Sequence, residues 1–291
     1  MIIVRLTGGL GNQMFQFAFG KALSLRQNTE LVLDPHIFFN YPLKKIFTKR
    51  KYELYNFNIR NRFWSSPIIS KLPAGGILNK YYVQLKNKIQ GIDIIIQEDY
   101  CFNNKYLYVK DNSYLVGTWQ SYKFFEDYHN EICKIYNNGL GENNDYLFYL
   151  EMIKNSNSIS LHVRRGDYVN NRYHPLCSQE YYMKAIKYIK RRIKEPKFFI
   201  FSDDLNYVKN NFTFLFDEKV IHIINKNKTS SDNELRLMSK CKHNIIANSS
   251  YSWWGAYLNL NHKKIVIYPK VWLANQETKT ADLFPSSWVE L

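Results

Sequence analysis

Hydrophobic positions near the start of the chain alternate between strand-length runs and a run with helical spacing. Residues 2–6 form a short, nearly continuous apolar run, and a glycine-rich turn at residues 7–12 follows it. From residue 13 to about 27, apolar residues recur at the spacing of a helix, and residues 30–34 form a second strand that stops at Pro35. This order is typical of a βαβ unit and predicts a parallel sheet.

The same alternation returns in the second half of the chain. The pattern predicts strands at residues 158–163, 197–201, 220–224, 244–247 and 265–268, and helices at residues 178–193, 205–210, 232–241 and 251–260. Between residues 36 and 115 the pattern is weak, and we expect loops and short helices there. A polar, glycine-bearing stretch at residues 137–144 is typical of a linker. We therefore expect two domains, residues 1–145 and residues 146–291.

Two parallel α/β units in one chain predict two Rossmann-like domains that face each other across a central cleft. In such folds ligands bind at the carboxyl ends of the strands. The motifs with chemical potential all follow predicted strands. The candidate site residues therefore belong to the loops at those strand ends.

The first motif is the turn at residues 8–13, Gly-Gly-Leu-Gly-Asn-Gln. A glycine turn between a strand and a helix brings backbone N–H groups close to a phosphate or a sugar. Asp34 lies near the position of the acidic residue in dinucleotide-binding proteins, but Met14 stands where the third glycine of that fingerprint belongs. Two alternative interpretations of the motif remain, a purely structural turn and a dinucleotide site with weak support. We favour a loop that contacts substrate. Its candidate binding residues are Gly9, Gly11, Asn12 and Gln13.

The second motif is residues 162–168, His-Val-Arg-Arg-Gly-Asp-Tyr. Because side chains alternate along a strand, His162 and Arg164 point to one face. The forked donors of an arginine at a strand end suit a diphosphate. The alternative is a surface arginine that pairs with Asp167. We take His162, Arg164 and Asp167 as candidate catalytic residues, with Asp167 either the general base or a residue that orients the arginines.

Two further segments follow strands. Asp203 and Asp204 come after the strand at 197–201, where carboxylates either bind a nucleoside or cap the next helix. No third carboxylate or histidine lies nearby at ligand spacing, so we expect no metal site. Ser249 and Ser250 stand between a strand and a helix, which favours an anion pocket. The tryptophan pair that follows, at residues 253–254, is open to a core role.

Composition narrows the class of protein. Among 291 residues, 45% are hydrophobic and 16% aromatic, which excludes a disordered chain. Four scattered cysteines without a CxxC pair fit reduced thiols rather than a disulfide framework or a zinc site. The net charge of +15 indicates either attraction to phosphates or simply a solvated basic surface. A nucleic-acid-binding protein is the alternative from another class, but the basic residues do not interleave with aromatic residues in any recognised module.

The N-terminal apolar run is broken by Arg5 and then by glycines, unlike a signal peptide. No stretch approaches the roughly 18 apolar residues of a membrane span. We therefore expect a cytoplasmic protein, at most peripheral to an anionic membrane surface.

With these residues in view, the chain resembles the bacterial α-1,2-fucosyltransferases, which share a superfamily with α-1,6- and protein O-fucosyltransferases. The resemblance is carried, in order, by residues 8–16, residues 162–168 and residues 241–255. It implies a GT-B-type architecture and an inverting transfer from GDP-β-L-fucose that needs no metal or other cofactor. The Ser-Trp-Trp-Gly segment at residues 252–255 favours the α-1,2 group over an α-1,6 linkage, which stays as the alternative.

The resemblance also implies roles for individual residues. Arg164 would hold the β-phosphate, with His162 beside the donor. The residues implied to bind the rest of the donor are Asp203 and Asp204 at the nucleoside, Glu234 at the guanine, and Asn248, Ser249 and Ser250 at the diphosphate. The expected acceptor is a terminal galactose on an oligosaccharide or glycolipid, as in lipopolysaccharide O-antigen synthesis, and it would bind to the first domain.

Overall fold

The computed structural model describes residues 1–40, 50–65, 88–89, 91–139, 141–169, 171–215, 218–223, 231–275 and 280–291. The chain forms two compact units. The first consists of Met1–Ile135 with Lys279–Phe284, and the second consists of Tyr136–Thr278 with Pro285–Leu291. We expected one domain boundary, at residue 145. The observed division differs from it, because the second unit begins at Tyr136 and Lys279–Phe284 belongs to the first unit.

Both differences have a packing reason. Tyr136, in helix α5 (His129–Asn137), is fully buried, and its ring centroid lies 5.1 Å from that of Trp254 in the second unit. The end of α5 therefore belongs to the second unit. Near the C-terminus, the backbone carbonyl of Asp282 accepts a 2.6 Å hydrogen bond from the Ser121 hydroxyl, and the Asp282 carboxylate pairs with Lys123. These contacts return the segment around Asp282 to the first unit.

The first unit contains a five-stranded sheet in the order β2-β1-β5-β4-β3. The strands are β1 (Ile2–Arg5), β2 (Leu31–Asp34), β3 (Lys88–Ile89), β4 (Ile92–Ile96) and β5 (Ser113–Val116). All neighbours are parallel except β3 and β4. The predicted βαβ unit is confirmed, with helix α1 (Leu10–Arg26) between β1 and β2.

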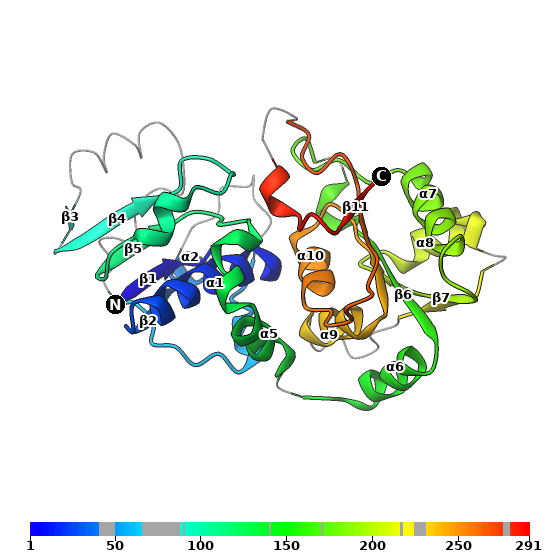
Figure 1. Cartoon of the computed structure of the whole chain (residues 1–291), viewed down its shortest axis with the longest axis horizontal. Helices are drawn as coiled ribbons and strands as arrows, with labels where there is room; N and C mark the ends of the chain where they lie inside the picture. Colours follow the sequence, from blue (N-terminus) through cyan, green and yellow to red (C-terminus); the bar gives the residue numbers. More distant parts are fainter. Residues whose placement is uncertain are drawn as a thin grey trace. The chain divides into compact units, whose positions relative to one another are not determined.

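Helix α1 packs very closely on its sheet, and Figure 1 shows it alongside β1 and β2. A Cβ atom added to Gly20 would lie 2.2 Å from Val4 Cγ2 and 2.9 Å from Leu31 Cδ1. Only a glycine leaves room for this approach. The residues of α1 are buried on most sides, because Phe19 also packs on Trp119 with ring centroids 4.6 Å apart.

The stretch from 36 to 115, expected as loops and short helices, also holds strands β3, β4 and β5. Its short helices are α2 (Ile37–Asn40), η1 (Leu54–Phe57) and η2 (Asn104–Tyr108). Two further 3₁₀-helices, η3 (Tyr122–Phe124) and η4 (Glu126–Tyr128), follow this stretch. The prediction missed β4 and β5 because no helix lies between them to indicate a βαβ unit: the connection holds only η2.

The second unit contains a six-stranded parallel sheet in the order β11-β10-β9-β6-β7-β8. Its strands are β6 (Asn157–Val163), β7 (Pro196–Ser202), β8 (Val220–His222), β9 (His243–Ile245), β10 (Val266–Tyr268) and β11 (Val289–Glu290). Its helices are α6 (Asn144–Lys154), α7 (Gln179–Lys190), α8 (Leu205–Asn211), α9 (Ser231–Lys240) and α10 (Ser250–Tyr257), and its 3₁₀-helices are η5 (Gly166–Tyr168) and η6 (Thr213–Leu215). A further 3₁₀-helix, η7 (Ala281–Leu283), belongs to the first unit. The predicted parallel α/β organisation is confirmed.

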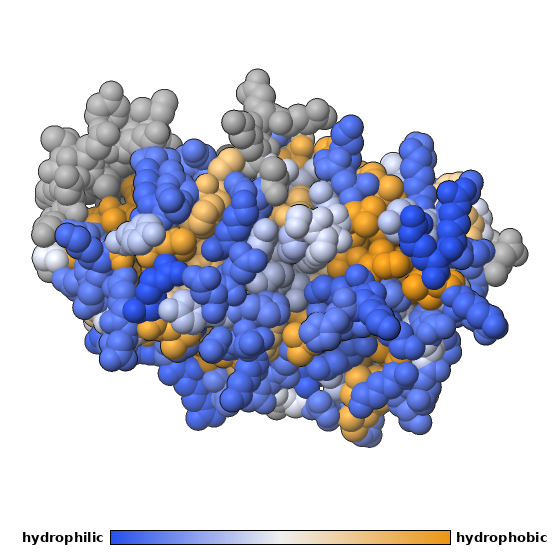
Figure 2. Space-filling view, in the orientation of Figure 1, coloured by the Kyte–Doolittle hydropathy of each residue, from blue (hydrophilic) through white to orange (hydrophobic). Residues whose placement is uncertain are grey.

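Both faces of this second sheet are covered, which explains the continuous apolar run of β7. Phe198 and Ile200 point to the face packed by α7 and α8, whereas Phe199 and Phe201 point to the face packed by α6 and α9. A parallel strand buried on both sides has no polar face to alternate with. The outer surface is mostly hydrophilic on the side seen in Figure 2. No helix in the described ranges is long and apolar enough to span a membrane.

The close approach at Gly20 gives a test of the first unit. We expect Gly20→Ala to lower the free energy of unfolding by about 1–3 kcal/mol, because the methyl group must displace Val4 and Leu31. Urea unfolding measures the effect. Gly141→Ala is the matched control, since a Cβ there meets nothing within 4 Å. Equal urea midpoints for both variants would contradict the packing described for α1.

Candidate functional site

Arg164 lies at the carboxyl end of β6, where two carboxylates hold its guanidinium group. Its Nη1 atom is 2.8 Å from Asp203 Oδ2, and its Nη2 atom donates to Asp167 Oδ1. Asp203 follows β7, which pairs with β6 in parallel, so both strands end at the same edge of the sheet. The side chains of Arg164, Asp167 and Asp203 are 22%, 19% and 27% exposed, which leaves the cluster open to a ligand.

The charge of Arg164 is stabilised within this cluster. Burial disfavours the cation, but the charges of Asp203 and Asp167 raise the pKa of Arg164 above its ordinary value. The Nε atom of Arg164 is buried and has no hydrogen-bond partner in the described part of the chain.

Gly166 makes the close contact between Arg164 and Asp203 possible. A Cβ atom on Gly166 would lie 2.4 Å from Asp203 Oδ2. The other oxygen of Asp203 accepts a 2.9 Å hydrogen bond from the backbone N–H of Arg165. The carboxylate of Asp203 is therefore fixed on both sides by the loop that follows β6.

Arg165 and Asp204 form a separate pair that serves the local structure. Arg165 Nε lies 3.2 Å from Asp204 Oδ2, and the Arg165 guanidinium stacks 3.3 Å from the ring centre of Tyr207. Asp204 also caps α8, because its Oδ1 accepts a 3.0 Å hydrogen bond from the N–H of Tyr207. Of the two neighbouring aspartates, Asp203 faces Arg164 and Asp204 begins a helix.

His162 is buried beside Arg164, with 3% of its surface exposed. Burial, reinforced by the charge of Arg164, lowers the pKa of His162 to about 3. Its ring lies 5.8 Å from that of Tyr251, and its Nδ1 has no hydrogen-bond partner among the described residues. The imidazole is therefore neutral at physiological pH and cannot act as a cation toward a phosphate.

Ser249 and Ser250 lie where α10 begins. Ser249 has an extended backbone, and its hydroxyl does not cap the helix. The first N–H groups of any helix have no acceptor within that helix, so they favour an anion. The Tyr251 hydroxyl donates to the carbonyl of Ser231 at the start of α9. Together with the His162–Tyr251 contact, this bond brings the end of β6 and the starts of α9 and α10 to one region of the second unit.

Asn248 organises loops instead of facing a ligand. Its Nδ2 donates to the carbonyls of Pro175 at 2.8 Å and Trp272 at 3.2 Å, and its Oδ1 accepts from the Cys177 thiol. Both amide hydrogens are therefore used within the protein. The tryptophans at 253 and 254 are fully buried, so the core alternative for that pair holds.

Glu234 lies in the first turn of α9, at a cavity between α6 and α9. The other lining residues are Asn143, Asp145, Tyr146, Tyr149, Ile223, Asn233 and Leu237. This cavity is open to the surface and measures about 20 Å³, so the described residues form a shallow depression beside Glu234.

In the first unit, the glycine turn is held together by its own polar residues. Gly8 has a φ of +75°, and a Cβ there would lie 2.5 Å from Asn12 Nδ2. Gln13 is fully buried, and its amide bonds the carbonyls of Gly8 and Lys51 and the N–H of Glu53. Asn12 Oδ1 accepts from Gln120 at 2.9 Å. These side chains thus shape the turn.

The other residues predicted to bind ligands in this region also make contacts within the protein. Gly9 precedes α1, with the Arg50 guanidinium 3.6 Å from the position of its missing Cβ, and Gly11 is buried in the first turn of α1. Asp34 is 2% exposed and accepts hydrogen bonds from the Tyr114 hydroxyl and the His36 N–H. A carboxylate used in this way is not presented to a ribose, which removes the basis for a dinucleotide site.

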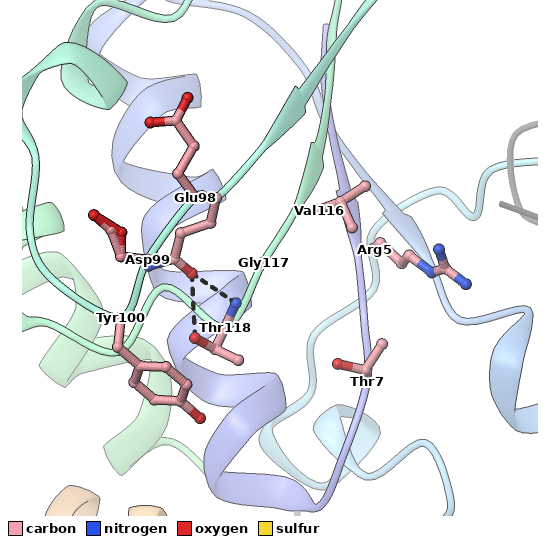
Figure 3. Close-up of a pocket in the computed structure, with 9 residues that line it drawn as sticks. Arg5, Thr7, Glu98, Asp99, Tyr100, Val116, Gly117 and Thr118 are labelled. Carbon is pink, nitrogen blue, oxygen red and sulfur yellow. Dashed lines mark hydrogen bonds between the residues drawn. The ribbon is translucent and has the colours of Figure 1, made fainter. Parts of the chain in front are cut away.

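The sequence did not indicate a cavity of about 230 Å³ at the carboxyl ends of β1, β4 and β5 (Figure 3). It is lined by Arg5, Thr7, Gln97, Glu98, Asp99, Tyr100, Val116, Gly117 and Thr118. The available signal was the apolar run at residues 94–96, which is followed at once by Gln-Glu-Asp-Tyr inside the stretch of weak pattern. Among the described residues, no group of three or more histidines, cysteines or carboxylates is arranged to hold a metal ion.

Comparison with known proteins places this geometry in a family. The sequence model of glycosyl transferase family 11 matches residues 1–291. The chain belongs to glycosyl transferase family 11. An alpha-1,2-colitosyltransferase from Escherichia coli is 34% identical over 310 residues, covering 100% of this chain and 99% of the relative. The O-antigen biosynthesis glycosyltransferase WbnK from the same species is 34% identical over 308 residues, covering 98% and 99%.

Two other comparisons extend this result. The galactoside alpha-(1,2)-fucosyltransferase 1 of Rattus norvegicus is 27% identical over 104 residues, which covers 34% of this chain and 27% of that protein. The structure of an Arabidopsis thaliana FUT1 mutant in complex with GDP has a TM-score of 0.53 at 12% identity, covering 92% of this chain and 70% of that one. The GT-B-type fold and the predicted family resemblance are confirmed, and this family 11 chain is a glycosyltransferase.

The buried state of His162 predicts a pH dependence of stability. The folded-state pKa lies below that of an unfolded histidine, so protons bind the unfolded chain first as the pH falls below about 6.5. Between pH 7.5 and 5, this group should remove about 2 kcal/mol of stability. We expect unfolding measurements to show a loss larger by that amount in the wild type than in His162→Asn. Parallel pH profiles for the two proteins would contradict a neutral, buried His162.

Proposed function

We propose that this glycosyltransferase moves L-fucose from GDP-β-L-fucose to the 2-hydroxyl of a terminal galactose on a glycan. The observation that carries the proposal is the Arg164 guanidinium held at the end of β6 in a family 11 chain. An alpha-1,2 linkage is named for the Escherichia coli colitosyltransferase, which is 34% identical over this whole chain. It is named also for the more distant galactoside fucosyltransferase of the rat.

Arg164 supplies charge where the reaction needs it. As the bond between the fucosyl carbon and the diphosphate breaks, negative charge grows on the β-phosphate and positive charge on the sugar. A fixed guanidinium stabilises that growing charge without reorganisation. The N–H groups at the start of α10, next to Ser249 and Ser250, would add to it. Asp203 and Asp167 hold the guanidinium in place during this step.

The acceptor hydroxyl attacks the opposite face of the fucosyl carbon as the bond to the diphosphate breaks, and its proton passes to solvent water. The attack converts the β-linked donor into an α-linked product and releases GDP. We propose that no metal takes part, because Arg164 and the helix N-terminus would carry the leaving-group charge. Asp167 is already paired with Arg164, so we assign it the orienting role and not that of the general base. His162, kept neutral by burial, would line the donor side of Arg164.

The base-binding role stays with Glu234. Its carboxylate can accept both N1–H and N2–H of guanine, a pair of donors that adenine does not have. In this assignment the base lies over the shallow depression between α6 and α9. Both oxygens of Asp203 and of Asp204 are already bonded within the protein, so a nucleoside would share these oxygens through their remaining lone pairs.

A second donor is supported by one specific observation. The named activity of a relative at 34% identity over the full chain is colitosyl transfer. Colitose is fucose without its 3-hydroxyl, so the choice of donor depends on whether the site has a hydrogen-bond partner for that hydroxyl. A site built to bond a hydroxyl rejects the analogue that lacks it far more strongly than the reverse.

A transfer assay with both donors tests the proposal. The protein is incubated with GDP-fucose or GDP-colitose and lactose in buffer containing EDTA, and NMR of the product gives the linkage. We expect an α-1,2 bond to galactose, formed at an undiminished rate with EDTA present. Transfer from GDP-colitose alone would establish the second donor. A product of another linkage, or no transfer to any galactoside from either donor, would overturn the proposal.

Arg164 gives the sharpest mutational test. We expect Arg164→Ala to lower kcat by about 10²–10³, the usual cost of a lost donor that stabilises charge in the transition state. Arg164→Lys should recover part of this loss, since lysine keeps the charge but not the forked geometry. Arg191→Ala is the control, because Arg191 is an exposed arginine just after α7 in the same unit. Steady-state kinetics measures kcat for each variant. A wild-type kcat in Arg164→Ala would refute the proposed role of Arg164 at the β-phosphate.

A further inference from the structure

We propose that Tyr168 is a positioning residue, which holds the Arg164 guanidinium in the orientation that a diphosphate needs. Tyr168 is the last residue of η5, in the loop that follows β6. The inference rests on the proposed function, which gives Arg164 its role at the β-phosphate. Tyr168 acts on the donor only through Arg164, and part of its test needs no transfer reaction.

The ring of Tyr168 supplies a restraint that the two carboxylates do not. Asp203 and Asp167 bond the Nη1 and Nη2 atoms of Arg164. The N–H groups of a guanidinium lie in its plane, so these bonds restrain it mainly within that plane. Arg164 Cζ lies over the Tyr168 ring, 5.4 Å from its centre, which is within the roughly 6 Å range of a cation–π contact. The ring therefore limits movement of the guanidinium out of its plane.

The ring is itself fixed by two contacts. The Tyr168 hydroxyl donates to the backbone carbonyl of Asn248 at 3.2 Å, and the ring stacks on His174 with centroids 4.8 Å apart and planes at 18°. Asn248 Nδ2 in turn donates to the carbonyl of Pro175, the neighbour of His174, at 2.8 Å. Tyr168 thus connects the loop after β6 to the residue that precedes Ser249 and the start of α10.

This connection matters for the affinity of an anion. A ligand that requires one orientation of Arg164 binds in proportion to the fraction of molecules that hold it. A guanidinium fixed before the reaction also stabilises growing charge without reorganisation. Loss of the Tyr168 contacts should therefore weaken both nucleotide binding and turnover.

Two variants of the full-length protein separate the hydroxyl from the ring. Tyr168→Phe removes only the bond to Asn248, whereas Tyr168→Leu also removes the aromatic face. We expect calorimetry to show the Kd for GDP raised about 2- to 10-fold in Tyr168→Phe and about 5- to 50-fold in Tyr168→Leu, as for one neutral hydrogen bond and one cation–π contact. The kcat for transfer should fall in the same order, and the KM for lactose should stay within twofold of wild type.

Tyr173→Phe and Tyr173→Leu are the matched controls. Tyr173 is 58% exposed, and Arg172 Cζ lies 4.7 Å from its ring centre while Arg172 Nη2 donates to its hydroxyl at 2.6 Å. The controls therefore remove the same kinds of contact from an arginine outside the Arg164 cluster, and they should keep the wild-type Kd and kcat. Thermal unfolding identifies any variant that fails to fold. A folded Tyr168→Leu with Kd and kcat within twofold of wild type, or equal losses in the controls, would overturn the proposal.

A double-mutant cycle tests whether Tyr168 acts through Arg164. In the Arg164→Ala background, Tyr168→Leu should change the Kd for GDP less than twofold, because no guanidinium is left to position. The same change in both backgrounds would show that Tyr168 supports the loop independently of Arg164, and the positioning role would be wrong.

A measurement without nucleotide separates this inference from the proposed function. NMR of ¹⁵N-labelled arginine follows the buried Nε–H of Arg164, which is assigned by its loss in Arg164→Lys. We expect a distinct signal in the wild type and in Tyr173→Leu, and a broadened or averaged one in Tyr168→Leu. If this is observed but no sugar is transferred, only the proposed transfer fails. An unchanged signal in Tyr168→Leu would overturn the positioning role even in an active enzyme, as would a wild-type signal typical of mobile arginines.

Discussion

The arrangement of the second unit depends on one electrostatic contact, the guanidinium of Arg164 between Asp203 and Asp167. It exists because β6 and β7 run parallel in a register that sets Val163 opposite Ser202, so the residues after each strand meet. Gly166 then allows the Asp203 carboxylate to come within contact of the loop. A shift of one residue in this register would turn the side chains to the opposite face and separate the charges.

The two units carry polar sites of different character. In the second unit, a half-buried arginine at the end of β6 lies in the same region as the start of α10, and both favour an anion. In the first unit, a cavity at the ends of β1, β4 and β5 is lined by threonine hydroxyls, an amide and side chains of both charges.

Buried amide side chains fix the loops that follow the strands. Gln13, Gln16 and Asn248 each bond backbone groups that are distant in the sequence, and each is 2% exposed or less. These amides lie in motifs that predicted ligand binding, because polar residues at strand ends often contact ligands. Their bonding to the protein's own carbonyls shows that they hold the shape of the site, while Arg164 and Gln97 retain unpaired donors within the described residues.

The sequence by itself determined the parallel α/β organisation and the first βαβ unit, because these depend on local periodicity and on residues adjacent in the chain. It did not decide between roles for Asp203 and Asp204, nor that Gln13 bonds Lys51, 38 residues away. Nor did it indicate the cavity around Gln97 and Thr118. Those features arise where parallel strands distant in sequence end at one edge of a sheet, and only the tertiary structure brings their side chains together.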